Sequence, residues 1–129
     1  MKQLDISDFL LLAEAASGIP AQSLEHPHVI SRAESALAAP FATFDGVEFY
    51  EGLVTKAAVL CSRIVRNHPL PDGNKRTAYL CMIELIRRNG AEWAPVQDDD
   101  ARVQAIEALA AGDVSEEQFA VWLRQHVRE

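Results

Sequence analysis

The stretch His68-Pro-Leu-Pro-Asp72-Gly-Asn-Lys-Arg76 separates two apolar segments near the middle of the 129-residue chain. Its prolines prevent a helix from continuing through it, and a new helix can begin after Gly73. The upstream segment, residues 53–67, has apolar residues at helical spacing. The downstream segment, residues 74–89, is apolar on all sides in its middle, which is typical of a helix at the centre of a domain. We therefore expect the stretch to lead into the central, buried helix.

Helix start and stop signals predict about six helices along the chain. They are expected near residues 5–16, 28–39, 53–67, 74–89, from 98 onward and from 115 onward. Residues 40–52 hold four aromatic residues and the turn-forming Asp45-Gly46, so we expect a flap with a short extended segment. The sequence thus predicts an all-α fold, a compact bundle of about six helices around a central buried helix, with residues 1–129 forming a single domain.

The composition, 49% hydrophobic with a net charge of −7, is typical of one soluble domain with its own core. No run of 18 apolar residues predicts a membrane span, and the first residues lack the pattern of a signal peptide. Cys61 and Cys81 lie in apolar helical segments, so we interpret them as small buried residues rather than as redox-active or metal-binding ones. We expect a cytoplasmic protein without a membrane partner.

The basic residues are concentrated in the middle of the chain. Residues 56–88 carry a net charge of +5, whereas the parts before and after each carry −6. This distribution favours a local anion site over a surface that binds nucleic acid directly. We interpret Arg87 and Arg88 as solvated charges near a helix C-terminus, and assign the anion site to Arg66, Lys75 and Arg76.

The central stretch combines three chemical elements. A glycine before a helix N-terminus lets backbone N–H groups turn toward an anion, and Lys75 and Arg76 add positive charge at the same point. His68 can accept a hydroxyl proton near neutral pH. Asp72 can hold Mg²⁺, which binds one or two carboxylates together with substrate phosphates. A base, a metal-holding acid and a phosphate site are what phosphoryl or nucleotidyl transfer needs.

Each element also has a plainer interpretation. His68 could end a helix, and Asp72-Gly73 could be an ordinary turn before a capping Asn74. The stretch is not a Walker P-loop, because the upstream glycine and strand are missing. The other three histidines, His26, His28 and His126, are interpreted as surface or capping residues rather than as a zinc site. Asp98-Asp-Asp100 is interpreted as a helix start rather than a metal site.

The central stretch resembles the signature of the Fic/Doc family, and specifically of its death-on-curing (Doc) toxin branch. Thr77-Ala-Tyr79, Arg87-Arg-Asn-Gly90 and the segment 31–40 are similar to the same branch. The resemblance covers roughly residues 20–125. It implies a helical fold that uses ATP and Mg²⁺.

The resemblance also implies roles for individual residues. His68 would be the general base, with Asp72 and Lys75 completing the catalytic set and Asp72 holding the metal. The implied phosphate-binding set comprises Arg66, Gly73, Asn74, Lys75 and Arg76. Leu70 stands where phenylalanine is common in the family, and we expect it to anchor the loop in the core.

Most Fic proteins transfer AMP and carry a glycine where this chain has Lys75, whereas Doc toxins have lysine there and phosphorylate elongation factor Tu. The resemblance therefore implies a Doc-like toxin, a protein kinase that arrests translation, with AMP transfer to a hydroxyl side chain as the alternative. A second alternative is a silent module that binds a nucleotide or a partner. No Ser/Thr-x-x-x-Glu-Gly/Asn segment for self-restraint is present. We expect a Phd-like antitoxin, whose disordered tail folds into a groove near the first helix, the flap and the signature.

Overall fold

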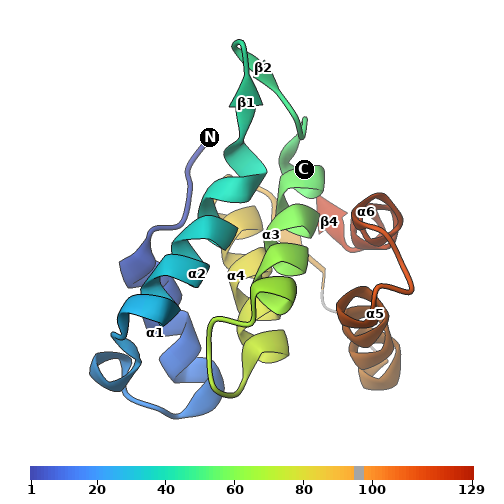
Figure 1. Ribbon diagram of the computed structural model, residues 1–129. Coiled ribbons are helices and arrows are strands. Elements are labelled where there is room, and N and C mark those ends of the chain that lie inside the picture. The colour runs from blue at the N-terminus through green and yellow to red at the C-terminus, as the bar shows by residue number, and fades with distance from the viewer. Residues whose placement is uncertain (95–97) are drawn as a thin grey trace.

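The computed structural model of the chain describes residues 1–94 and 98–129, and this part contains six α-helices and two small sheets. The helices are α1 (Ile6–Ser17), α2 (Pro27–Ala38), α3 (Leu53–Asn67), α4 (Asn74–Arg88), α5 (Asp99–Ala111) and α6 (Glu116–Arg124). The short elements are the 3₁₀ turns η1 (Ala21–Leu24) and η2 (Ala39–Phe41) and the strands β1 (Thr43–Phe44), β2 (Val47–Glu48), β3 (Glu92–Trp93) and β4 (Val127–Arg128). The predicted all-α class and helix bundle are confirmed (Figure 1).

Local capping signals set the helix ends. The Asp5 side chain accepts a hydrogen bond from the Asp8 N–H at 2.9 Å, and the Asp8 carboxylate accepts one from the Asp5 N–H at 2.9 Å. This reciprocal box starts α1, and Gly18, with φ of 77°, ends it in the left-handed region. Ser115 and Gln118 form a second capping box at the start of α6. The predicted helix boundaries therefore hold at these ends.

A central buried helix exists as predicted, but it is α3 rather than α4. Eleven of the fifteen residues of α3 are buried, compared with seven of the fifteen in α4. The buried set includes Lys56, which donates a hydrogen bond to the Tyr50 carbonyl oxygen and lies 3.2 Å from a Glu48 carboxylate oxygen. Polar residues such as Lys56 lower the apparent hydrophobicity of α3, so the sequence understates how completely α3 is enclosed.

The flap is a hairpin of β1 and β2, which pair antiparallel around Asp45-Gly46. Figure 1 shows it beyond the first turn of α3, whereas the loop between α3 and α4 lies at the opposite end of that helix. A 15-residue helix is about 22 Å long. We expected the first helix, the flap and the signature to border one groove. The flap cannot border it together with the signature, because the two lie at opposite ends of α3.

Both cysteines are free and buried, as predicted. Burial raises the pKa of the Cys61 thiol to about 12, and it raises the pKa of the Cys81 thiol as well, so both remain protonated at neutral pH. In the described part of the chain, no helix combines the length and apolar character needed to cross a membrane.

The second sheet was not predicted from the sequence. β3 and β4 pair antiparallel, with Trp93 opposite Val127, and join the chain after α4 to the C-terminal segment. The His126 ring lies against Trp122 and Trp93, with centroid distances of 4.9 and 5.8 Å. His126 is thus half-buried in an aromatic cluster, which corrects its assignment to the surface.

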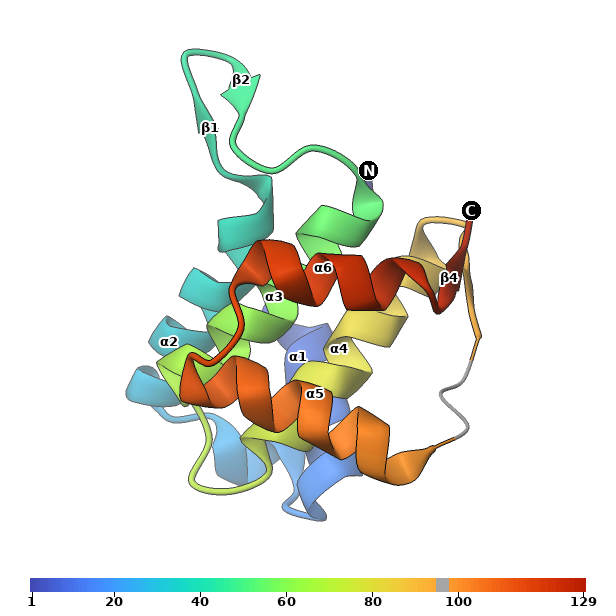
Figure 2. The same cartoon turned by 90° about the vertical axis from the view of Figure 1, so that its right-hand side faces the viewer.

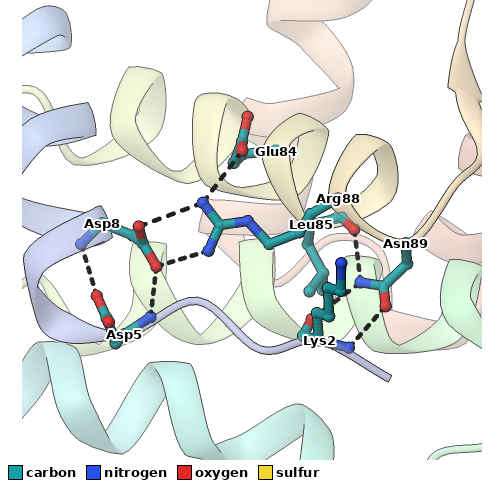
Figure 3. A network of polar contacts seen from close by, with 7 residues as sticks. All are labelled: Lys2, Asp5, Asp8, Glu84, Leu85, Arg88 and Asn89. Atoms are coloured by element: carbon teal, nitrogen blue, oxygen red, sulfur yellow. Dashed lines mark hydrogen bonds and ion pairs between the residues drawn. The ribbon is translucent and has the colours of Figure 1, made fainter.

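Helices α1 and α4 are joined by the polar network in Figure 3. Arg88 donates two hydrogen bonds to the Asp8 carboxylate, at 2.7 and 3.2 Å, and a third to Glu84 at 3.2 Å. The Asn89 side chain exchanges hydrogen bonds with the Lys2 backbone at 2.7 and 2.9 Å. The prediction that Arg88 is a solvated charge is wrong, because the packing of α1 on α4 brings Asp8 to it. Arg87 is exposed, as expected.

The Asp8–Arg88 pair predicts a pH-dependent contribution to stability. The hydrogen bonds from Arg88 hold the pKa of Asp8 below its ordinary value of about 3.9. The contribution is therefore fully present above that value and is lost as the pH falls through the lower folded-state pKa. At pH 7 we expect Asp8→Asn to lower the free energy of unfolding by roughly 1 kcal/mol.

Urea unfolding of wild type and D8N at pH 7 and near pH 2 measures this contribution. The difference between the two proteins should shrink as the pH falls through the lowered folded-state pKa of Asp8, because the protonated aspartate is then uncharged like the asparagine. The control is Asp113→Asn, which changes an exposed aspartate. A difference of the same size at both pH values would contradict the ion-pair explanation.

Candidate active site

His68 sits where α3 ends. Its backbone adopts the left-handed conformation, with φ of 48°, and its N–H donates to the Ile64 carbonyl oxygen at 3.1 Å. The plainer interpretation of His68 as a helix cap is therefore correct for its backbone. The side chain is exposed and lines a cavity, so the cap leaves the imidazole free for chemistry. A non-glycine residue held in this strained region is often found at functional sites.

The loop after His68 is anchored by Leu70 and Asn74. Leu70 is only 2% exposed, which confirms that it packs into the core. Its N–H donates to Asn74 Oδ1 at 3.0 Å, and Asn74 Nδ2 donates to its carbonyl oxygen at 2.9 Å. Asn74 itself is 6% exposed. The Asn74 side chain thus holds the loop instead of facing the cavity, and only its backbone N–H remains available for a phosphate.

Gly73 has no side chain where α4 meets α1. Its φ is 80°, and a Cβ atom placed on it would lie 3.4 Å from Ser17 Cβ. Its carbonyl oxygen accepts the first hydrogen bond of α4, from the Thr77 N–H at 2.9 Å. The next three residues, Asn74, Lys75 and Arg76, form the first turn of α4, whose N–H groups have no helical partner. This turn carries partial positive charge and is suited to bind an anion.

An open cavity of about 990 Å³ lies in front of this turn. It lies where the C-terminal ends of α1 and α5 meet the α3–α4 loop, and its volume is within the range that holds a nucleotide-sized ligand. Of the predicted site residues, the cavity brings together His68, Asp72, Gly73, Asn74, Lys75 and Arg76. Its walls also include Ser17 and Glu107, which no sequence signal had indicated.

Arg66 does not belong to this cavity. It is exposed, and its guanidinium lies 3.6 Å from a Glu116 carboxylate oxygen. The same oxygen accepts a hydrogen bond from Arg63 at 2.9 Å. Burial raises the pKa of Glu116, but the hydrogen bond from Arg63 and the two positive charges outweigh it and lower the pKa. The contact of Arg66 with phosphate stays a prediction, and the structure places its guanidinium beside Glu116 of α6 rather than among the residues that line the cavity.

The two remaining cations differ in their contacts. Arg76 Nη1 donates to the Ala16 carbonyl oxygen at 3.3 Å, which links α4 to the C-terminus of α1. Lys75 is exposed and lines the cavity. The Lys75 side chain is therefore free to adjust its position to a bound phosphate. Arg76 also lines the cavity, but its hydrogen bond to Ala16 helps to hold α4 against α1.

Asp72 is the residue of the loop that could hold a metal ion. Its carboxylate is exposed and lines the same cavity as Lys75 and Arg76. No group of three metal-ligating side chains occurs in the described residues. This donor set fits Mg²⁺, which keeps several waters and is usually bound by one or two carboxylates together with substrate phosphates.

The comparison with known proteins agrees with this site. The model of the Fic/DOC family matches residues 4–86, which include the whole α3–α4 loop, and the chain belongs to this family. A similar protein is "Toxin Doc" from Mycolicibacterium smegmatis, which is 37% identical over 90 residues. The matched region covers 70% of this chain and 69% of that protein. The predicted resemblance to the Doc branch is thereby confirmed.

Proposed function

We propose that the protein is a Doc-like toxin of a toxin–antitoxin pair that uses Mg-ATP to phosphorylate elongation factor Tu and so arrests translation in the cytoplasm. The observation that carries the proposal is that an exposed imidazole, a free helix N-terminus and Lys75 all border the same cavity. Family membership and the similarity to a Doc toxin support the same reaction class. The presence of Lys75 at the start of α4 favours phosphate transfer over AMP transfer.

In the proposed reaction, His68 accepts the proton of a target hydroxyl group. The hydroxyl oxygen forms a bond to the γ-phosphorus of ATP as the bond from that phosphorus to the β–γ bridging oxygen breaks, and ADP leaves. The N–H groups of the first turn of α4 and the charge of Lys75 stabilise the negative charge on the transferred group. Mg²⁺ held by Asp72 would neutralise further phosphate charge. In the alternative, the bond forms to the α-phosphorus and pyrophosphate leaves.

Label transfer tests the proposal directly. The protein is incubated with elongation factor Tu, Mg²⁺ and ATP labelled either at the γ- or at the α-phosphate. We expect elongation factor Tu to carry label from γ-labelled ATP only. Label from the α-phosphate would instead establish AMP transfer, and the absence of label from either position would leave the protein as a binding module without catalysis.

Lys75 should decide between the two reactions. We expect Lys75→Gly to lower γ-label transfer and to raise α-label transfer, because it removes a charge and leaves a cradle made of backbone N–H groups alone. Lys75→Ala is the matched variant, since it removes the same charge while retaining a good helix former. If the charge sets the reaction, K75A and K75G change the two transfer rates alike. Unchanged rates in both variants would remove Lys75 from the account.

We also propose that a Phd-like antitoxin restrains the toxin. The groove for its tail would include the end of α1 and the α3–α4 loop, which border the cavity. The β1–β2 hairpin lies at the other end of α3 (Figure 1) and would not be part of that groove. Calorimetric titration of the antitoxin into the protein, with and without Mg-ATP, tests this placement. If both occupy the cavity, Mg-ATP should weaken the binding of the antitoxin.

A further inference from the structure

A second cavity of about 200 Å³ lies between α4 and α5, beside the first one. Figure 2 shows α5 crossing in front of α4. The two cavities share Lys75, Arg76 and Glu107. The second one is otherwise lined by Tyr79, Arg102, Val103 and Ile106. A ligand whose phosphates lie at the first turn of α4 can therefore extend directly into the second cavity.

The walls of the second cavity suit a flat ring. Tyr79 is half-buried, with its ring 5.8 Å from that of Trp93 in an edge-on arrangement and 5.3 Å from the Arg102 guanidinium carbon. These contacts hold the aromatic wall in one orientation. Burial raises the pKa of the Tyr79 phenol, so the wall stays uncharged at neutral pH. A rigid wall of aromatic and aliphatic side chains is typical of a subsite for a heterocycle.

The polar groups of this cavity have a defined donor and acceptor pattern. Arg102 offers only donors, and its side chain is 36% exposed. Its Nε–H is inaccessible and has no hydrogen-bond partner among the described residues, so the donors open to a ligand are those on its Nη atoms. Its nearest carboxylate, the exposed Asp99, lies 3.7 Å from Nη2, beyond hydrogen-bond distance. Glu107, when ionised, only accepts hydrogen bonds. The cavity therefore suits a ring that presents adjacent acceptors to the arginine and adjacent donors to the glutamate.

We propose that the second cavity is the nucleobase subsite and that Arg102 and Glu107 make it prefer guanine to adenine. Guanine presents two acceptors, O6 and N7, to a bidentate arginine, whereas adenine pairs its N7 with an N6 donor. Guanine also carries two neighbouring donors, N1–H and N2–H, and the Glu107 carboxylate can accept hydrogen bonds from both. The inference rests on the proposed function, because it assumes a nucleoside triphosphate at the first turn of α4. GTP then serves as a donor alongside ATP and binds more tightly, by roughly tenfold.

Isothermal titration calorimetry of the full chain in Mg²⁺ with GTP, ATP and inorganic triphosphate tests the preference. The informative quantity is the ratio of the GTP and ATP dissociation constants, since the phosphate contacts are common to both. We expect the ratio to approach one in Arg102→Met and in Glu107→Gln. The matched control is Arg87→Met, which changes an exposed arginine of α4 outside both cavities and should retain the wild-type ratio.

The variant Arg102→Lys keeps a positive charge but loses the bidentate geometry, so it should also lose the preference for GTP over ATP. Circular dichroism checks that each variant is folded. ATP binding as tightly as GTP, or a ratio unchanged by R102K and E107Q, would overturn the inference while leaving the proposed function intact. If none of the three compounds binds wild type, the proposed function fails, and the inference fails with it.

Discussion

Replacement of His68 by alanine is expected to lower the rate of label transfer to elongation factor Tu by roughly 10²–10⁴-fold, the usual effect of removing a general base. The imidazole is exposed and lines the cavity, so the loss should come from the chemical step rather than from the fold. Single-turnover transfer from γ-labelled ATP measures it. Binding of Mg-ATP should change much less than the rate.

Two further variants separate the role of the imidazole from that of the strained backbone. Asparagine tolerates the left-handed conformation better than alanine does, so His68→Asn tests the side chain with less backbone strain. His26→Ala removes an exposed histidine that makes no capping hydrogen bond at the start of α2. Transfer by H68N at the wild-type rate, or an equal loss in H26A, would show that His68 is not the base.

Replacement of Asn74 by alanine is expected to lower the free energy of unfolding by about 2–4 kcal/mol. The change leaves the N–H and carbonyl groups of the buried Leu70 without partners, and each unpaired buried group costs about 1–3 kcal/mol. The loop that carries His68 should also lose its fixed shape, so label transfer falls together with stability. Urea unfolding and label transfer, measured on the same preparation, give the two effects.

The matched control for this prediction is Asn67→Ala. Asn67 lies on the other side of His68 and donates one exposed hydrogen bond, to the Arg32 carbonyl oxygen at 3.1 Å. Its loss should lower the free energy of unfolding by roughly 1 kcal/mol or less. If N74A were no less stable than N67A, the buried tether between Asn74 and Leu70 would not be what holds the loop.

The parts of the fold that depend on local chemistry could be predicted from the sequence. Asp5, Gly18 and Ser115 set helix ends through bonds that span only a few residues. The loop of the site was likewise predictable, because Pro69, Pro71 and Gly73 interrupt two helical patterns. Leu70 was correctly predicted as a core anchor because it occupies a position where the family commonly carries an apolar phenylalanine.

The features that sequence reasoning missed all depend on which helix packs against which. Arg88 was assigned to solvent because its partner, Asp8, is 80 residues away in the chain. The pairing of Arg66 with Glu116 of α6 was likewise not predictable, because the two residues are far apart in the chain. Glu107 entered the site only because α5 packs over the start of α4. No local pattern carries this information.

The most direct measurement of the central claim is a map of amide chemical shifts in ¹⁵N-labelled protein on addition of Mg²⁺ and a non-hydrolysable ATP analogue. In the proposed complex, phosphate binds to the backbone N–H groups at the start of α4. We therefore expect the largest shifts at Gly73, Asn74, Lys75 and Arg76, with little change in the hairpin at residues 43–48. Unshifted amides at 73–76, with the largest changes elsewhere in the chain, would contradict this expectation.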